Sequence, residues 1–349
     1  MNLHVNMVAY NEERHIEEAI DSILSQSFRD FELVVHDNCS TDRTVEICER
    51  IASGDRRLRI NRGRFNVGAV LQQLRVHCNW DADYVAFRSA NDVMHPDYVA
   101  EAMELLSSNP DVGLAYSHGC DFAGDIATAT PTPDEFCIDT RGLSRSQACA
   151  EVMGRYCSPH PLWGVWRRGV REMCRACQFS YGSDHVLIAE AALYGHVAAT
   201  PGRLDYRRQA ARDGREVLRD NATHHSCEES VRGCDLGSVF SSPKILMPFV
   251  DLAYSHIEML SMARISDDER VALMDAALVI FRARFGERLA MEARVFAEWL
   301  STAADAVSEA SQSSRVLICT WRTKVAREIG KLRTLNLPTE ACDRMLAQC

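Results

Sequence analysis

The chain has 349 residues, of which 46% are hydrophobic and 25% are charged, and its formal net charge is −10. These values are ordinary for a globular protein, and the length allows more than one compact unit. The acidic balance argues against a general binder of nucleic acid, because phosphate backbones require clustered Lys and Arg. It does not argue against a local pocket for a single nucleotide.

The sequence indicates neither a membrane span nor a signal peptide. No apolar run reaches the ~18 residues of a spanning helix, and Met1 to His4 lack the basic and apolar regions of a signal peptide. We therefore expect a cytoplasmic protein in which most of the 14 cysteines are reduced thiols. Cys174 and Cys177 form the one CxxC pair, and a helical face explains them better than a zinc site, which needs four ligands.

The N-terminal part of the chain alternates between strand and helix patterns. Residues 3–8 alternate apolar and polar side chains, as a strand requires, and residues 16–24 carry an apolar stripe at helical spacing, with Asn11 placed to cap that helix. Such alternation predicts an α/β fold with a mainly parallel sheet flanked by helices. The Thr- and Pro-rich stretch 119–142 predicts a mobile or substrate-covering loop. Further strands are expected at 31–35, 58–60 and 84–87, and further helices at 45–52, 68–77 and 96–106.

Polar residues follow the ends of the predicted strands. Tyr10 and Asn11 follow the first strand, and Asp37 and Asn38 end the second. Because the carboxyl ends of parallel strands meet at one edge of a sheet, we expect these side chains to line a ligand crevice there. Turn formation is the alternative, since Asp-Asn and Ser-Thr-Asp are common loop sequences.

The segment VAYNEERHIEEAIDSILSQSFRDFELVVHDNCSTDRT resembles the start of family 2 glycosyltransferases, which have the GT-A fold. This resemblance implies an inverting enzyme that moves a sugar from a nucleotide-diphosphate donor, with UDP or TDP favoured, to an acceptor hydroxyl. The processes that it implies are glycosylation of cell-surface polysaccharide, glycolipid or a secondary metabolite. The implied donor-binding residues are Ala9, Tyr10, Asn11, Asp37, Asn38, Arg64 and Asn91.

Asp92 is the metal ligand that the resemblance implies. Relatives place an acidic group after the fourth strand, where it holds Mg²⁺ or Mn²⁺ against the donor diphosphate. This chain departs from the pattern, with Asn91 beside Asp92 and Ser89 before them. One carboxylate with an amide binds a cation more weakly than two carboxylates do, so we expect the cation to bind mainly with the nucleotide. The alternative is that Asp92 caps the helix that Pro96 begins.

Asp184 is the catalytic base that the resemblance implies. The segment FSYGSDHVLIAEAALYG is similar to the family segment in which an Asp before a helix deprotonates the acceptor hydroxyl. A helix N-terminus favours the carboxylate and weakens it as a base, whereas a closed, dry cleft has the opposite effect. Ser183 and Asp184 could instead serve only as caps of that helix.

The acceptor and diphosphate side is expected around two further segments. Trp163 and Trp166 resemble positions on the acceptor side and could stack against a sugar ring, or could be core residues. Arg207 and Arg208 resemble a segment near the diphosphate. Where many relatives carry a His shortly after this segment, Gln209 stands here, which puts a further metal ligand in doubt. The substitutes that the sequence offers are His160, His185, His224 and His225.

The sequence divides into residues 1–240, the expected GT-A-like domain, and residues 241–349, an expected all-helical region. Its apolar stripes include Val271, Met274 and Phe281. These helices could pack on the first domain, form a homodimer, or contact the inner membrane face peripherally through basic residues. Those basic residues are Arg322, Lys324, Arg327, Lys331 and Arg333.

Saccharide, lipid-linked and small-molecule acceptors remain open at this stage, as do two other functions. A non-catalytic relative that binds a nucleotide-sugar would explain the depleted acidic group at Asn91-Asp92. A nucleotidyltransferase also places a nucleotide on a parallel sheet, but it usually needs a Gly-rich, basic phosphate loop near the N-terminus. Residues 9–13 are neither Gly-rich nor basic.

Overall fold

The computed structural model describes residues 2–67, 72, 76, 81–134, 137–155, 160–175, 182–209, 247–310 and 315–348. These residues group into two compact units. Among these described residues, every strand lies in the first unit, and the four helices that follow residue 247 lie in the second. The boundary expected at residue 240 lies outside the described residues and stays a prediction, as do His224 and His225.

The first unit is built on one nine-stranded sheet with the order β3-β2-β1-β4-β8-β6-β9-β5, and β7 pairs with β6. The first four strands run parallel, as the sequence predicts. The whole sheet is mixed, because the short β8 runs antiparallel to both β4 and β6. The strands are β1 Leu3–Ala9, β2 Phe31–Asp37, β3 Leu58–Arg62, β4 Tyr84–Ser89, β5 Val93–Met94, β6 Val112–Phe122, β7 Thr130–Pro131, β8 Val165–Arg167 and β9 His196–Arg208.

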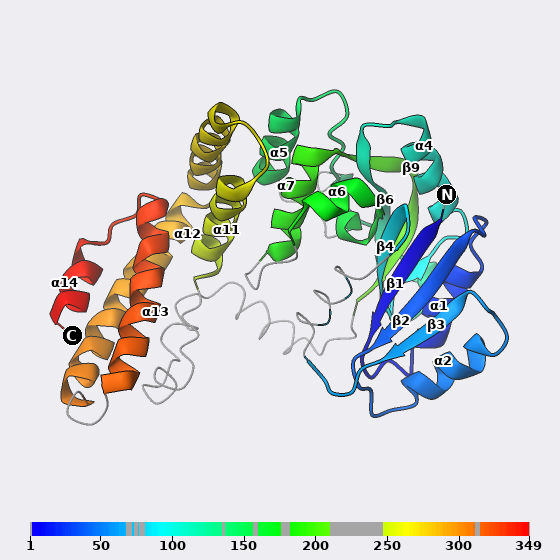
Figure 1. Cartoon of the computed structure of the whole chain (residues 1–349), viewed down its shortest axis with the longest axis horizontal. Coiled ribbons are helices and arrows are strands. Elements are labelled where there is room, and N and C mark those ends of the chain that lie inside the picture. Colours follow the sequence, from blue (N-terminus) through cyan, green and yellow to red (C-terminus); the bar gives the residue numbers. More distant parts are fainter. Residues whose placement is uncertain are drawn as a thin grey trace. The chain divides into compact units, whose positions relative to one another are not determined.

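Helices flank this sheet (Figure 1). The apolar stripe of α1 is fully buried in the core of the sheet, at Ile16, Ile20 and Ile23, which confirms the expected amphipathic helix. Asn11 is not its cap, because α1 begins at Ile16. The described helices of this unit are α1 Ile16–Leu24, α2 Thr44–Ala52, α4 Tyr98–Ser108, α5 Arg145–Gly154, α6 Arg168–Met173 and α7 Ser183–Tyr194, with short 3₁₀ turns η1 Ile126–Thr128 and η3 His160–Trp163.

The helix expected at 68–77 lies mostly outside the described residues, although Gln72 and Val76 are buried. The stretch 119–142 is not a single loop. It contains the end of β6, the turn η1 and the short strand β7, because Cys120 and Asp121 pair with Thr130 and Pro131.

The second unit contains α11 Pro248–Met262, α12 Asp267–Ala310, α13 Arg315–Thr334 and α14 Glu340–Gln348. Its helical character agrees with the sequence pattern. The stripe on α12 is shifted relative to the expectation, since Leu273 and Ala277 are buried with Phe281 while Val271 is 60% exposed. Among the described helices, none is long and apolar enough to cross a membrane.

Candidate functional site

The ends of the four parallel strands bring the expected donor residues to one edge of the sheet. Ala9 ends β1 beside Asp37, which ends β2, and Asp37 in turn lies beside Arg62 at the end of β3. The N–H of Asn38 donates to the carbonyl of Ala9 at 2.9 Å. The carboxyl ends of these strands therefore lie side by side, as the sequence predicts.

Asn11 joins the loop after β1 to the loop after β2. Its N–H donates to Ser40 Oγ at 3.0 Å, and its side-chain oxygen accepts from the N–H of Thr41 at 2.8 Å. Asn11 takes a positive φ of 53°, which an L-residue adopts only at some cost. Tyr10 beside it is 44% exposed. The two loops thus form one rigid rim from which the ring of Tyr10 projects.

Asp37 and Asn38 are buried and hold the surrounding loops. The carboxylate of Asp37 accepts hydrogen bonds from the N–H groups of Cys39 and Ser40. The amide of Asn38 donates to Asn66 Oδ1 at 2.9 Å and accepts from the N–H of Val67 at 3.0 Å. Both side chains therefore hold the loops at this edge in place, which is the turn-forming role that the sequence left open.

Arg64 lies on an exposed loop that runs close over the end of β2. Gly63 makes this approach possible, because its N–H donates to the carbonyl of Asp37 at 2.7 Å and a Cβ at Gly63 would lie 2.8 Å from that oxygen. Arg62 is paired with Glu49 at 2.7 Å and so points to α2. Of the two arginines, Arg64 is the one whose side chain is available to a donor at this edge.

Asp92 is only 8% exposed, and its carboxylate accepts a hydrogen bond from the N–H of Arg208 at 2.8 Å. Burial raises the pKa of Asp92 to about 6, against the opposing charge of Arg88. Asn91 is half-buried, and its side-chain oxygen accepts from Ser89 Oγ at 2.6 Å. The acidic position is thus a single carboxylate held inside the fold.

Asp92 can hold a divalent cation only if other molecules supply most of its ligands. Within the described residues, no three His, Cys, Asp or Glu side chains are grouped as metal ligands. A hard cation takes six or more oxygen ligands, and Asp92 offers one carboxylate, one oxygen of which accepts the Arg208 N–H. The residues therefore fit a cation whose other ligands come from a bound diphosphate and water.

Arg207 and Arg208, at the end of β9, are both engaged with protein groups. Arg207 is paired with Asp121 at 2.8 Å. The guanidinium of Arg208 is paired with Glu18 and donates from Nε to the carbonyl of Asn91 at 3.0 Å. Arg208 therefore fixes the backbone around Asp92, and its contribution to a diphosphate would be electrostatic.

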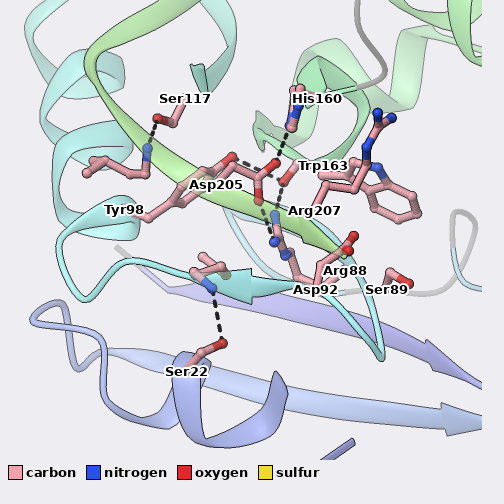
Figure 2. A network of polar contacts seen from close by, with 12 residues as sticks. Ser22, Arg88, Ser89, Asp92, Tyr98, Ser117, His160, Trp163, Asp205 and Arg207 are labelled. Carbon is pink, nitrogen blue, oxygen red and sulfur yellow. Dashed lines mark hydrogen bonds and ion pairs between the residues drawn. The ribbon is translucent and has the colours of Figure 1, made fainter. Parts of the chain in front are cut away.

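The two tryptophans of the acceptor segment have different environments. Trp166 is fully buried, with its indole N–H donating to the carbonyl of Leu162, so its ring belongs to the core. Trp163 is half-buried at the end of η3. Its carbonyl accepts from Tyr98 Oη at 3.3 Å and lies 3.5 Å from an Arg88 nitrogen (Figure 2). Of these two residues, Trp163 is the one that stays partly exposed.

A buried polar network that the sequence did not reveal lies beneath this segment. Asp205 on β9 binds Arg88 on β4 with one oxygen and His160 on η3 with the other, both at 2.6 Å (Figure 2). An arginine inside the apolar strand YVAFRS was the one available signal, because a buried guanidinium requires a partner. The identity of that partner, 117 positions along the chain, could not be inferred.

Asp184 lies in the first turn of α7 and is half-buried. Its carboxylate accepts from the N–H of the next residue, His185, at 2.9 Å. The ring of His185 contacts the carbonyl of Arg155. His160 and His185 therefore both bind other protein groups, the carboxylate of Asp205 and the carbonyl of Arg155.

Comparison with known sequences finds a family whose model matches the part of the chain that carries Tyr10, Asp37 and Asp92. Residues 5–132 match the model of glycosyl transferase family 2. The chain is 29% identical over 109 residues to an uncharacterized glycosyltransferase of Haemophilus influenzae. This match covers 31% of this chain and 33% of that protein. It is 33% identical over 108 residues to the putative glycosyltransferase EpsE of Bacillus subtilis, covering 30% of this chain and 38% of EpsE. The chain thus spans less than two fifths of the length of these two relatives.

Comparison with solved structures supports the same fold. A crystal structure of residues 1–349 of TarS from Staphylococcus aureus aligns with a TM-score of 0.57 at 14% identity, covering 87% of this chain and 81% of that one. A likeness at this identity concerns the fold alone. The resemblance to family 2 and its GT-A fold is confirmed, while the roles of individual site residues stay predictions.

Proposed function

We propose that this chain, whose residues 5–132 belong to glycosyl transferase family 2, transfers a sugar from a nucleotide-diphosphate sugar to an acceptor hydroxyl. The observation that carries the proposal is that the matched residues contain the four parallel strands whose carboxyl ends form the polar edge. Ligands bind at this edge in open α/β sheets. Tyr10, Arg64 and Asn91 are the proposed donor contacts, on a rim that Asn11, Asp37 and Asn38 hold in place.

UDP and TDP are the nucleotides that we favour. The TarS neighbour has been solved with UDP-GlcNAc, which makes UDP the first nucleotide to test for this chain. A pyrimidine base needs an aromatic face and a few polar groups, and the exposed ring of Tyr10 supplies the first. The acceptor is a saccharide, a lipid-linked sugar or a small molecule, as in the synthesis of surface polysaccharide, glycolipid or a glycosylated secondary metabolite.

The proposed reaction is one in-line displacement that inverts the anomeric carbon. Asp184 takes the proton of the acceptor hydroxyl as its oxygen forms the new bond to that carbon. The bond from the carbon to the donor oxygen breaks, and its electron pair leaves with the nucleoside diphosphate. Geometry decides whether Asp184 can act in this way, because a carboxylate at a helix start is a weak base unless the cleft excludes water.

Asp92 would hold Mg²⁺ or Mn²⁺ together with the donor. When bound, the cation would neutralise negative charge on the leaving diphosphate. The chain's own contribution is to fix Asp92 through the N–H of Arg208 and to add the positive charges of Arg207 and Arg208 nearby. We therefore expect the cation to bind more weakly without nucleotide than with it.

Calorimetric titration of UDP, TDP, GDP and ADP, with and without Mn²⁺, tests the donor part of the proposal. We expect metal-enhanced binding of a pyrimidine nucleotide that is lost in Asp92→Ala. Binding without any effect of Mn²⁺ would remove Asp92 as a metal ligand, and absence of binding to all four nucleotides would contradict the proposal.

The catalytic part is tested with Asp184→Asn. We expect this variant to bind the nucleotide as the wild type does and to lose transfer by about a thousandfold or more, because a positioned base contributes on that order. Wild-type-like transfer by the variant would show that another group acts as the base.

One observation favours a second candidate, a protein that binds a nucleotide-sugar without transferring it. The acidic position holds a single buried carboxylate with an amide beside it. Nucleotide binding with no transfer to any member of a broad acceptor panel, and no hydrolysis of the donor, would favour this reading. Slow hydrolysis of the donor by water would already exclude it.

A further inference from the structure

The carboxylate of Asp205 is shared between two cationic or potentially cationic groups in the interior of the first unit. One oxygen lies 2.6 Å from Arg88 and the other 2.6 Å from Nδ1 of His160. The three side chains are only 2–3% exposed. We call Arg88, Asp205 and His160 the Asp205 trio.

A buried ionic group of this kind is rarely the most stable solution for a core. Apolar residues of similar volume often stabilise a fold as well or better, because three polar groups must be removed from water. Such groups are better explained when they fix one arrangement among several. The trio connects three separate elements, β4, β9 and η3, so it can fix how η3 lies on the sheet.

The turn η3 is held at both of its ends by this network. At the start of the turn, His160 binds Asp205 and contacts Thr132 Oγ1 through Nε2 at 3.2 Å. At the end of the turn, the carbonyl of Trp163 accepts from Tyr98 Oη and lies within 3.5 Å of Arg88. Figure 2 shows that the indole ring of Trp163 lies to the side of the trio and not among its three side chains.

The fit around His160 leaves the turn little freedom. A Cβ added at Gly119 on β6 would lie 1.8 Å from Cε1 of His160, so the imidazole rests directly on the backbone of β6. His160 is therefore confined by packing on one side and by Asp205 on the other. A turn confined in this way can hold a neighbouring side chain in one orientation.

We propose that the Asp205 trio positions Trp163 for the acceptor, so that Arg88, Asp205 and His160 are positioning residues of the acceptor subsite. The proposal rests on the proposed function, because it takes the ligand of Trp163 to be a saccharide. The trio holds the backbone of Trp163, and the half-buried ring then presents a fixed apolar face to the sugar.

Acrylamide quenching of tryptophan fluorescence tests this positioning without any turnover. The chain has five tryptophans, and the variant Trp163→Phe measures how much the other four contribute to the quenched fluorescence. We expect His160→Ala to raise the quenching constant assigned to Trp163 about twofold, since the ring loses its fixed orientation. His160→Asn, which can keep a donor to Asp205 near the position of Nδ1, should restore most of the wild-type value.

Ser117→Ala is the matched control. Ser117 is buried beside the trio, and its hydroxyl bonds to two residues of β9: it accepts from the N–H of Leu204 and donates to the carbonyl of Gly202. We expect it to lower the thermal midpoint without changing the quenching of Trp163. The proposal is overturned if His160→Ala leaves that quenching unchanged, or if Ser117→Ala changes it as much.

The catalytic consequence is a selective loss of acceptor binding. With methyl hexosides as acceptors and UDP-GlcNAc as donor, His160→Ala should raise the acceptor KM about tenfold and keep the Kd of UDP within about twofold. A parallel loss of UDP affinity would contradict a role confined to the acceptor. If the wild type transfers to no methyl hexoside, the proposed function loses support, while the quenching result still decides the positioning role.

Discussion

Asn38 shows how a single side chain at the candidate site can be tested for its role. Its amide bridges to Asn66 and Val67 and so ties down the loop that carries Arg64. We expect Asn38→Asp to weaken UDP binding about tenfold, because a carboxylate cannot donate to Asn66 Oδ1 and would repel it. Calorimetric titration of UDP measures the effect.

The control for this prediction is Asn38→Ala, which removes the bridge without adding a charge. A similar loss in both variants would assign the effect to the loop. Equal or tighter UDP binding by Asn38→Asp would mean instead that this side chain contacts the nucleotide directly.

The carboxylate of Asp205 makes the stability of the fold depend on pH, and the direction of that dependence can be predicted. Burial alone would raise the pKa of Asp205, but the charges of Arg88 and His160 outweigh it and lower the pKa to about 2. A carboxylate whose folded pKa lies below its ordinary value stabilises the fold above pH ~4, and this stabilisation is lost as the pH falls toward 2. The shift corresponds to about 2 kcal/mol.

We therefore expect Asp205→Asn to lower the free energy of unfolding by about 3 kcal/mol at pH 7, since Arg88 would be left buried without its charge partner. Urea unfolding measured at pH 7, 4 and 3 should show the difference from the wild type narrowing as the pH falls. A difference that is constant over this range would show that the charge of Asp205 does not contribute.

At the scale of elements, the early strands and helices could be predicted because their signals are local. The period of two in β1 and the apolar stripe of α1 lie within a few residues of each other. The long strand β9 has no such signal, since Pro201 and Gly202 interrupt it and resemble a turn. In the structure these two residues form a bulge opposite Ser117 and His118. The Ser117 hydroxyl spans this bulge, because it donates to the carbonyl of Gly202 and accepts from the N–H of Leu204.

The same limit applies to the site. The donor edge could be predicted because each strand end carries its own polar residues. The Asp205 trio could not, because its members come from three elements that meet only in the folded chain. The burial of Trp166 could not be predicted either. The sequence of a short strand is the same whether its tryptophan faces a ligand or packs in the core.

Glu292 on α12 provides a prediction for the second unit. It is fully buried, and its carboxylate accepts from the N–H groups of Phe249 and Val250 at 3.1 and 2.9 Å, at the start of α11. A negative charge there satisfies two N–H groups that the helix leaves unpaired and complements its dipole. We expect Glu292→Gln to destabilise this unit by about 1–2 kcal/mol and Glu292→Ala by about 3 kcal/mol.

Thermal unfolding followed by circular dichroism would measure this loss on the full chain. UDP binding at 20 °C, well below the transition, should be unchanged in Glu292→Gln, because the cap lies in the other unit. Equal stability of Glu292→Ala and the wild type would show that water satisfies these N–H groups as well as the carboxylate does.

At the scale of the whole molecule, the charge on α13 bears on what the C-terminal helices bind. Lys331 is paired with Asp251 and Glu328, and Arg333 is paired with Asp343. The same helix buries Val325, Ile329 and Leu332. The apolar face of α13 therefore packs within the second unit. Of the five basic residues expected to contact a membrane, Lys331 and Arg333 are in ion pairs within that unit.

We therefore expect no stable attachment to a membrane surface. The three basic residues left exposed, Arg322, Lys324 and Arg327, would each contribute about 1 kcal/mol near an anionic surface, and the net charge of −10 opposes the approach. Flotation of the full chain with vesicles containing phosphatidylserine, at low and at physiological salt, measures this. Flotation that persists at physiological salt and disappears when the three residues are changed to Ala would show that α13 is a membrane contact, and a lipid-linked acceptor would then become the first to test.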